Sequence, residues 1–577
     1  MATGNFFFGA FTRIPGVRAG VDDSGLTPIQ IGSPRTVAII GKADGGIPKT
    51  PILISLPQQA SQMLRSGELL EATLRCFNAS PEVRGASLVY IVRVDPATAA
   101  SKALLDAGGG TTITLNAVNY GPLDNQIKAS VANGTTVGKK ITLKQGLAVY
   151  AKDDLYQAAL TIQYTGAGSA STLTINATSL VTGVTGGPGG ETLNLVFTSY
   201  ATIQALADAI DANPAYTAVV NHRNPQAATA NAFDFVTTVD LKTAPVIVTS
   251  TLQAIVDWLN SGAQDLVTAV RGATGLLPAN ITDTYLTGGA NGSVVNQDWQ
   301  DCFDALQTKD VAFVCPISGD ASLHAMAVTH AQLMSASGKT PRKAFVGGIS
   351  GEKTATLSNY VARAQAINSD RGVLAVQGVK DYDIYGNLVT FPPYIFAAQM
   401  AGMQSGVNEI GDAITHKSMK AVGLEWTPTE GDKEIIIDKG GCLVELVENR
   451  GFFRVVRGIT TWRQNDAYHR VEISTGIALD EVVRDVIEAL EQYVGQKASP
   501  LIATRALSTT KSVLKGLEEA QIIVGDDTNR AFKNLMASIA GDTLTIEFDC
   551  SPVVPINFIR IRVHATTFSG VITAAVA

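Results

Sequence analysis

The chain has 577 residues, of which 46% are hydrophobic and 16% are charged, and its formal net charge is −7. The length predicts two to four domains, and the negative charge argues against a nucleic-acid partner or an anionic membrane surface. The charged fraction lies below the usual value of about 25%. It fits two alternatives equally, a surface that copies of the chain bury, or a large α/β enzyme with a big core.

The first 35 residues are expected to form an extended arm that glycines and prolines interrupt. Its apolar side chains are Phe6, Phe7, Phe8, Phe11, Ile14 and Val17. The N-terminus has no basic stretch followed by a continuous apolar run, so no signal peptide is expected. An apolar, strand-prone end aggregates if water surrounds it, so another surface must cover this arm.

A β-α-β pattern follows the arm, with strands at 36–41 and 87–94 and helical spacing around 63–77. The same alternation returns after residue 249. Helices are expected at 251–260, 297–306, 320–337 and 357–367, and strands at 311–315, 344–346 and 373–376. Residues 36–107 and 249–430 are therefore predicted to form one α/β core domain, with a parallel sheet covered by helices on both faces.

Residues 108–248 differ in composition from the segments around them. They are rich in Thr, Gly, Ala, Asn and Val, and turn clusters separate short runs of alternating polarity. This pattern predicts a β-rich inserted domain, a sandwich or a barrel, with one helix at 202–213. The glycine-rich stretch at 183–190 lacks a strand-glycine-helix order, so we interpret it as a hairpin tip and not as a phosphate-binding loop.

Residues 431–565 are predicted to form an α+β C-terminal domain. We expect helices at 478–494 and 509–520, and strands at 451–458, 544–548 and 557–565. The tail 566–577 has no charge and no proline, and its apolar side chains Phe568, Val571, Ile572 and Val576 indicate a second arm. The expected fold class is an α/β core plus an α+β C-terminal domain, with a β-rich inserted domain and extended N- and C-terminal arms.

No catalytic, metal or cofactor site is predicted, and the chain is not expected to be an enzyme. Gly338-Lys339-Thr340 follows a helix, and Leu333 stands where a P-loop needs its first glycine. His324 and His330 fall on different faces of one helix. No Gly-x-Ser-x-Gly turn occurs.

The five cysteines contain no Cys-x-x-Cys pair, which excludes a zinc ribbon and favours reduced thiols. No apolar run reaches the roughly 18 residues of a membrane helix, so no membrane insertion is expected.

Several motifs, in their order along the chain, resemble those of contractile-tail sheath proteins of myoviruses and related injection machines. The resembling segments are IPGV (14–17), TVAIIGKADGG (36–46), YGPLDNQI (120–127), LTGGANG (286–292), RVVRGITTW (454–462), EQYVGQ (491–496) and INFIRIRVHA (556–565). One of them departs from the family, because Asp124 stands where the family has a glycine.

This resemblance implies that the chain is a structural tail sheath protein. It implies that both arms donate strands to C-terminal domains of neighbouring subunits, with an acceptor strand that contains Ile559, Ile561 and Val563. Six-fold rings then form a helical homopolymer around a tail tube protein. Baseplate and tail terminator proteins are further partners, and the virion tail, assembled in the host cytoplasm, is the expected location. The sheath would contract from a metastable extended state and drive the tube through the host envelope.

Charges on the two C-terminal helices are possible contacts with the tube or with neighbouring rings. They are Asp485, Glu488, Glu491, Lys511 and Lys515. Weak polar contacts release quickly, which suits a lattice that rearranges. The alternative is that these residues only form solvated helix faces.

Two other function classes stay open on the sequence alone. A cytosolic α/β enzyme with a β-rich accessory domain fits the composition, although it lacks a recognisable catalytic set. A β-rich surface or adhesin protein fits the Thr- and Gly-rich insertion, although the α/β core and the missing signal peptide oppose it.

Overall fold

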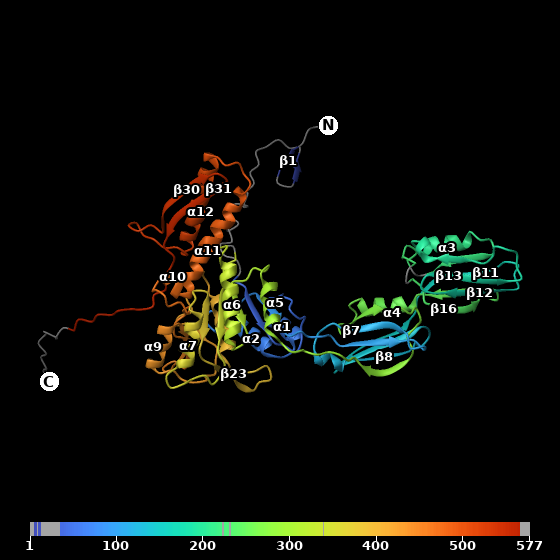
Figure 1. Cartoon of the computed structure of the whole chain (residues 1–577), viewed down its shortest axis with the longest axis horizontal. Coiled ribbons are helices and arrows are strands. Elements are labelled where there is room, and N and C mark those ends of the chain that lie inside the picture. Colours follow the sequence, from blue (N-terminus) through green and yellow to red (C-terminus); the bar gives the residue numbers. More distant parts are fainter. Residues whose placement is uncertain are drawn as a thin grey trace, which may run out of the picture.

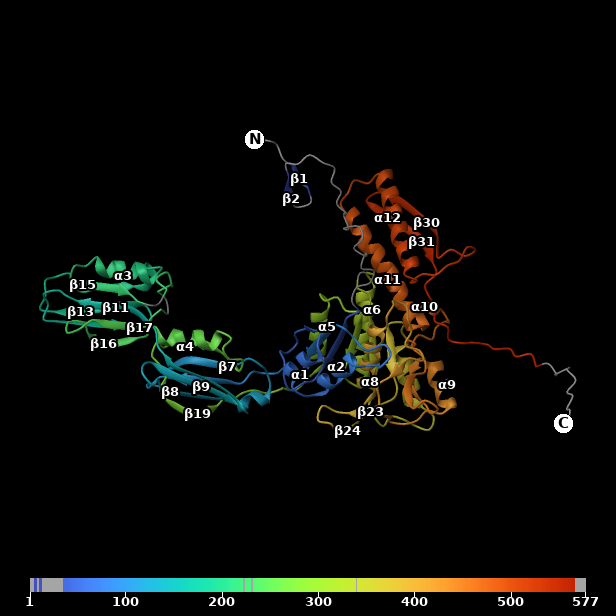
Figure 2. The ribbon, with the colours of Figure 1, turned by 180° about the vertical axis from the view of Figure 1, so that it is seen from behind.

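The computed structural model describes residues 5–7, 10–12, 35–221, 224–229, 232–338 and 340–565. It contains a central core unit, two β-rich units that extend from one side of the core, and a C-terminal unit that stands on the core (Figures 1 and 2). The chain is a mixed α/β protein, as the sequence predicted. None of the helices in these ranges combines the length and the apolar character that a membrane span requires.

A seven-stranded sheet lies at the centre of the core unit, in the strand order β27-β22-β21-β20-β3-β5-β4. Neighbouring strands are parallel, except that the edge strand β4 is antiparallel to β5. The strands are β3 (Val37–Gly41), β4 (Ile52–Ile54), β5 (Val89–Arg93), β20 (Phe313–Pro316), β21 (Lys343–Gly347), β22 (Gly372–Ala375) and β27 (Gly441–Cys442).

Alternate residues of the central strands supply the two faces of this sheet. Val37 and Ile39 pack with α1 (Pro57–Leu64), α2 (Glu68–Phe77) and α8 (Pro393–Gly406). Ala38 and Ile40 pack with helices on the opposite face. Those helices are α5 (Asn296–Leu306), α6 (Ala321–Ser335), α7 (Ser358–Ile367) and α9 (Glu430–Lys439). Because both faces are covered, the strands have continuous apolar sequences and no alternation.

The near β unit, adjacent to the core, packs two antiparallel sheets and one helix around a single apolar cluster. The first sheet contains β6 (Ser101–Leu105), β7 (Thr111–Ala117) and β18 (Val267–Arg271). The second sheet contains β8 (Lys128–Asn133), β9 (Lys139–Gln145), β10 (Ala148–Leu155) and β19 (Ile281–Tyr285). Helix α4 (Thr251–Asn260) contributes Leu252, Ile255 and Leu259 to the cluster, and η1 (Pro122–Gln126) joins the two sheets.

The far β unit forms the outer end of the molecule and has its own apolar cluster (Figure 1). One sheet contains β11 (Ala158–Tyr164), β15 (Tyr216–Val220) and β17 (Val246–Thr249). The other contains β12 (Ala170–Ile175), β13 (Ser179–Thr185), β14 (Asn194–Val196) and β16 (Val236–Asp240). Helix α3 (Ile203–Asp211) and η2 (Phe197–Ser199) complete this unit.

One β-rich inserted domain was expected at 108–248. In the structure β6, β18 and β19 pair with strands of that segment, and α4 packs against them. The β-rich region therefore extends over 101–285 and contains two separate cores. The boundary was placed at 249 because the helical spacing at 251–260 resembles that of the core unit. The division into domains stays a prediction.

The C-terminal unit consists of two helices and one hairpin. Its elements are α11 (Ile473–Leu490), η3 (Glu491–Tyr493), α12 (Pro500–Glu519), β30 (Phe532–Ala540) and β31 (Thr543–Cys550). The two long helices pack side by side, and the hairpin lies on α12. Two small sheets and α10 (Tyr468–Val471) complete the core below this unit. The strands of these sheets are β23 (Val379–Tyr382), β24 (Leu388–Phe391), β25 (Ser418–Met419), β26 (Gly423–Leu424), β28 (Val444–Val447) and β29 (Phe452–Val455).

Three expected elements of the C-terminal region differ in the structure. The helix expected at 478–494 begins at Ile473 and ends at Leu490, and the helix expected at 509–520 begins at Pro500. The strand expected at 557–565 does not form within the described chain. A strand needs a partner for its backbone groups, and none of the described strands pairs with these residues.

Candidate assembly site

The hairpin β30–β31 is an unfinished sheet. Its strands pair only with each other among the described residues, through pairs such as Ile539 with Leu544 and Ala537 with Ile546. Both outer edges therefore carry backbone N–H and C=O groups without a strand partner. Such edges are ready acceptors for a further strand, and a two-stranded sheet has only marginal stability by itself.

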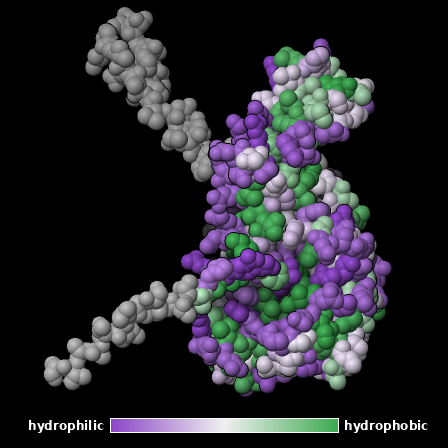
Figure 3. All heavy atoms as spheres, turned by 90° about the vertical axis from the view of Figure 1, so that its left-hand side faces the viewer, coloured by the Kyte–Doolittle hydropathy of each residue, from purple (hydrophilic) through white to green (hydrophobic). Residues whose placement is uncertain are grey.

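One face of the hairpin is apolar and only partly covered. Leu535, Ile539, Ile546 and Phe548 are half-buried, and Met536 on the other face is 58% exposed. Figure 3 shows hydrophobic side chains among hydrophilic ones over the C-terminal unit, at the top of the view. A strand added at an edge of the hairpin would extend this apolar face over α12.

The described part of the C-terminal arm leaves the molecule as an extended segment (Figures 1 and 2). Its large apolar side chains are Ile556, Phe558, Ile559, Ile561 and Val563, and each is at least 80% exposed. The predicted arm residues Phe568, Val571, Ile572 and Val576 lie outside the described residues. An exposed apolar run of this length is an aggregation hazard unless a partner covers it.

The predicted N-terminal arm contains a short antiparallel hairpin, β1 (Asn5–Phe7) with β2 (Ala10–Thr12). Phe6 pairs with Phe11 in its backbone register, and Phe7 lies in the same hairpin. The other predicted contact residues, Phe8, Ile14 and Val17, lie outside the described residues. The roles of all these residues in contacts between subunits stay a prediction.

The charged residues predicted to touch a tube or a ring all lie on the C-terminal unit. Asp485 and Glu488 are on α11, Glu491 is in η3, and Lys511 and Lys515 are exposed on α12. Burial, and then the charge of Glu488, raises the pKa of Asp485 to about 6. Their contacts with other molecules stay a prediction.

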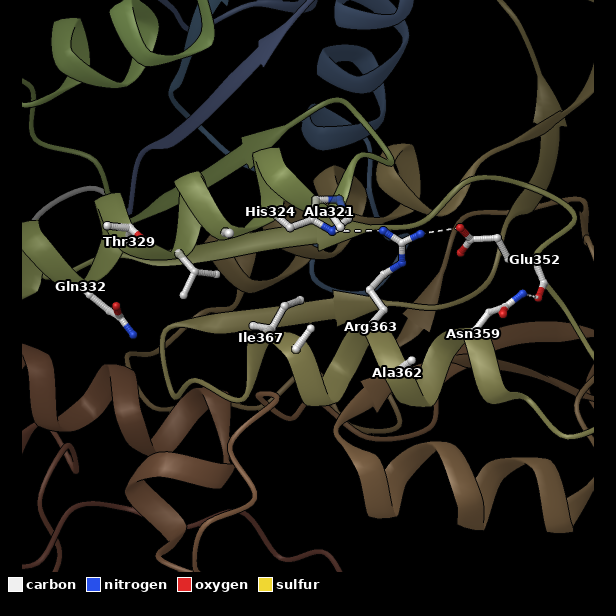
Figure 4. A pocket seen from close by; sticks show the side chains of 12 residues that line it. Ala321, His324, Thr329, Gln332, Glu352, Asn359, Ala362, Arg363 and Ile367 are labelled. Atoms are coloured by element: carbon white, nitrogen blue, oxygen red, sulfur yellow. Dashed lines mark hydrogen bonds and ion pairs between the residues drawn. The ribbon is translucent and has the colours of Figure 1, made fainter. Parts of the chain in front are cut away.

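A groove with a volume of about 710 Å³ lies between α6 and α7 (Figure 4). Its walls include the short side chains of Ala321, Ala325, Ala362 and Ala366. At one end of the groove Arg363 forms an ion pair with Glu352 and donates to the carbonyl oxygen of Gly319 at 2.8 Å. His324 lies beside Arg363 at the same end (Figure 4).

His324 is held as a neutral structural group. Its Nε2 lies 2.9 Å from the carbonyl oxygen of Ser318, and its Nδ1 lies 3.4 Å from the Arg363 guanidinium. Burial, with a further contribution from the charge of Arg363, lowers the pKa of His324 to about 4. A neutral ring that donates from Nε2 and accepts at Nδ1 satisfies both contacts. Both nitrogens are then engaged, so the groove offers no free imidazole for catalysis.

The side chains of Cys302, Cys442 and His330, outside this groove, are also buried, and burial keeps them uncharged at neutral pH. Burial raises the pKa of the Cys302 and Cys442 thiols to about 12, so they stay protonated at neutral pH. Burial, with the charge of Arg342, lowers the pKa of His330 to about 4. Within the ranges that the structure describes, His, Cys, Asp and Glu side chains form no group of three that could hold a metal ion.

Comparison with known proteins identifies relatives along nearly the whole chain. The tail sheath protein of Bacillus phage SP01 is 28% identical over 578 residues, which cover 97% of this chain and 96% of the relative. The putative tail sheath protein of Enterococcus phage phiEF24C is 28% identical over 568 residues, which cover 95% and 96%. The chain is homologous to phage tail sheath proteins. No model of a known protein family matches the sequence.

A solved sheath tail protein shares the fold of this sheath homologue. The protein, from Listeria innocua, is 12% identical and superposes with a TM-score of 0.53 over 90% of this chain and 96% of its own. The resemblance drawn from the ordered motifs is therefore confirmed. Since the sequence relatives match over 95% or more of the chain, the homology includes the β-rich region as well as the core.

Part of this site was not predicted from the sequence. A strand was expected at 544–548, but its partner β30 and the open edges of the hairpin were not. The available signals were the turn at Gly541-Asp542 and the alternation of Leu544, Ile546 and Phe548 with polar residues, which together favour a hairpin.

Proposed function

We propose that the chain is the subunit of a contractile tail sheath, which polymerises as a helix around a tail tube in a phage virion. One observation carries the proposal. A single chain that is homologous to tail sheath proteins has both an unpaired apolar arm and an unfinished sheet. Each feature supplies what the other lacks, because strand addition pairs free backbone groups and covers apolar side chains.

The arm of one subunit is proposed to complete the sheet of another subunit. The hairpin β30–β31 lies at the far end of the C-terminal unit, whereas the arm departs from the base of that unit and runs away from it (Figure 1). The described arm therefore does not lie along its own hairpin. Pairing between different copies is a heterologous contact, which builds rings or open helices.

The arm sequence suits an edge strand of a half-covered sheet. Along 558–563, Ile559, Ile561 and Val563 alternate with Phe558, Arg560 and Arg562. In a strand the first three would share one face and the arginines would lie on the opposite face. This proposal changes the role that the resemblance implied for Ile559, Ile561 and Val563, which become part of the donated arm, while β30–β31 becomes the acceptor.

The proposed cycle follows from strand exchange. Subunits assemble on the tube in six-fold rings and form a stretched lattice that a kinetic barrier holds. A baseplate signal releases the first ring, the subunits rotate as nearly rigid bodies, and the tube is driven through the host envelope. Backbone pairing between arm and hairpin survives this rotation because it depends on a local sheet, not on the angle between subunits. A tail terminator closes the far end, assembly takes place in the host cytoplasm, and no nucleotide is consumed.

The experiment that tests this proposal removes the arm. Chains that end after Pro555 or after Ala565 are expected to fold as monomers and to form no tubes. Two substitutions provide a sharper comparison. Ile561→Asp adds a charge to an arm side chain that is 80% exposed, and Val149→Asp adds one to a side chain of the near β unit that is 58% exposed. Negative-stain micrographs should show tubes for the control and none for the arm variant.

Two results would contradict the proposal. One is a chain that ends after Pro555 and still forms tubes of normal length. The other is a full-length chain that stays monomeric at high concentration in the presence of a tail tube. In both cases the arm would have to be covered in another way.

A further inference from the structure

We propose that Glu472, Asn557 and Arg35 are positioning residues, which fix the directions in which both arms leave the subunit. They form one junction along the first half of α11. This inference rests on the proposed exchange of arms, and it adds the residues that determine where each neighbour is attached. The RVVRGITTW segment (454–462), one of the motifs that carry the resemblance, supplies part of the junction through Arg457.

The C-terminal arm is fastened by one side chain. Asn557 donates from Nδ2 to Oε1 of Glu472 at 2.9 Å. It is half-buried, whereas every other residue of 556–565 is exposed. Glu472 is fully buried at the N-cap of α11. The arm is therefore held at Asn557 and leaves the molecular surface directly after it.

The carboxylate of Glu472 is well suited to hold this asparagine. Arg457 donates to the same Oε1 from Nε at 3.1 Å and from Nη2 at 2.5 Å, and the guanidinium lies 5.9 Å from the ring of Phe558. Hydrogen bonds to a buried charged group are stronger than those between neutral groups. Releasing Asn557 would also remove one donor from a carboxylate that water does not reach.

The N-terminal arm is fastened to the loop at 407–412, which follows α8. Arg35 donates to the carbonyl oxygen of Val407 at 2.5 Å and to that of Glu409 at 3.3 Å. Burial lowers the pKa of the Arg35 guanidinium, while the nearby charges of Glu481 and Asp412 raise it. Glu481 lies on α11, so Arg35, at the base of this arm, also lies near that helix.

The same loop contacts the base of the C-terminal arm. A Cβ atom built on Gly411 would lie 2.4 Å from Cγ1 of Val553 and 3.6 Å from Cβ of Ala478. Val553 is bonded to the body of the C-terminal unit, because its N–H donates to the carbonyl oxygen of Ile522 at 3.0 Å. The loop thus lies between the two arms and leaves no room for a side chain at position 411.

The three attachment points follow one another along α11. Glu472, Ala478 and Glu481 lie within ten residues, and the nine steps from the first to the last correspond to about 14 Å of helix. The helix is in turn tied to the core, because Asp480 accepts two hydrogen bonds from Arg371, at 2.5 and 2.9 Å. A force applied to either arm is therefore transmitted to α11, and from α11 to the core through the contact between Asp480 and Arg371. The hairpin that receives a neighbour's strand stays outside this path.

Trypsin tests the attachment of the C-terminal arm in the unassembled subunit. Arg560 and Arg562 are natural cleavage sites directly beyond Asn557. A protease needs several residues of free chain on each side of the cleaved bond, so the hold on Asn557 should protect Arg560. We expect Asn557→Ala to speed cleavage after Arg560 about tenfold, with the melting temperature changed by less than about 2 °C. Gln496→Ala, an exposed residue after α11, is the control and should leave both quantities unchanged.

A swap of functional groups separates positioning from folding. Asn557→Asp places a second carboxylate beside Glu472, and like charges at this distance repel, so the arm should be released. The double variant Glu472→Gln with Asn557→Asp restores one amide and one carboxylate, and it should slow cleavage again. Equal cleavage rates in the wild type, Asn557→Ala and Asn557→Asp would overturn the inference.

Assembled tubes supply the second measurement. Tubes of Asn557→Ala and of Arg35→Ala are expected to show a broader range of helical twist than wild-type tubes by cryo-electron microscopy. Identical twist in all three would contradict the role of the junction while leaving arm exchange intact. If the wild type forms no tubes although Asn557→Ala speeds cleavage, the proposed function fails and the local attachment stands.

Discussion

The negative charge of Asp485 lowers the free energy of unfolding of the isolated subunit at neutral pH. Its pKa is about 6 in the folded chain, against an ordinary value of 3.8, because of burial and the charge of Glu488. The folded state therefore binds more protons than the unfolded state between these values, and stability falls as the pH rises through this window. The penalty is fully present above pH 6 and absent below about pH 4.

The substitution Asp485→Asn should remove this penalty. We expect the free energy of unfolding to increase by about 1–2 kcal/mol at pH 7.5 and to change little at pH 4. Urea titrations at the two pH values measure the difference. Glu488→Gln, at an exposed position on the same helix, is the matched control and should have a smaller effect. An equal gain at both pH values would show that the burial of Asp485 does not determine its charge.

At the scale of elements, the hairpin β30–β31 should change most when subunits assemble. Its outer edges lack strand partners in the described chain, so their amide hydrogens are open to water. We expect the amide exchange of 532–550 to slow at least tenfold in tubes, because a donated strand pairs with an edge. Strands β3 and β20 lie inside the core sheet and serve as the internal reference. Unchanged exchange in the hairpin would argue against strand addition there.

The strands of the core sheet could be predicted from the sequence, because burial on both faces gives each strand a short run of apolar residues. The segment at 37–41 has no charged residue, and all five of its residues are buried. The helix expected around 63–77 was less simple. It is two helices, α1 and α2, since Arg65 and Gly67 between them have φ values of 63° and 106°. The apolar residues on both sides of Arg65 and Gly67 keep a helical spacing, so the spacing alone did not reveal that the helix is broken there.

The early start of α11 and α12 depended on tertiary packing. Residues 473–477 include Thr475 and Gly476, which are poor helix formers. Gly476 is required there because a Cβ atom would lie 2.8 Å from the backbone carbonyl oxygen of His469. For α12, Ser499 before Pro500 was a helix-start signal, and the Ser499 side chain accepts from the N–H of Ile502. The β-branched residues that follow obscured that signal.

The candidate site was half predictable. The apolar character of the arms is a local property of the sequence. The boundary of the C-terminal arm was not predicted, because Ile559, Ile561 and Val563 were expected in an acceptor strand and are 80–84% exposed in the extended segment. The acceptor was not predictable in the same way. A missing strand partner is a property of the folded sheet, and no residue type marks it. The same holds for the junction, since Asn557 and Glu472 are 85 residues apart in the chain.

At the scale of the whole molecule, the far β unit is joined to the near β unit by two chain connections and a few contacts between them. Arg271 donates to the carbonyl oxygen of Phe233, and the N–H of Phe235 donates to that of Gly275, each at 2.8 Å. The chain enters it after Gln157 and returns at Ser250, where the N–H of Ser250 donates to the carbonyl oxygen of Gln157 at 2.8 Å. The unit also has its own apolar cluster. It projects away from the core and from the C-terminal unit (Figure 2).

Removing this unit should leave the rest of the fold intact, although α4 loses the Asp234 carboxylate, which accepts from the N–H groups of Thr251 and Leu252. Joining Gln157 to Ser250 through a short glycine linker is expected to give a chain that melts within a few degrees of the full-length protein. The shortened chain should still form tubes, with the same helical twist and a smaller outer diameter. Micrographs and light scattering measure both. Loss of tubes from a folded, shortened chain would show that the unit takes part in the lattice.

The cysteines have one practical consequence. Cys76, Cys302, Cys315 and Cys442 are buried, whereas Cys550 is only partly so. Cys550 ends β31, and burial raises its pKa, so a maleimide dye should attach there slowly but at one position in each subunit. The unaltered chain thus provides its own site for a fluorophore at the rim of the hairpin, where a change in emission would report in real time the arrival of a neighbour's strand.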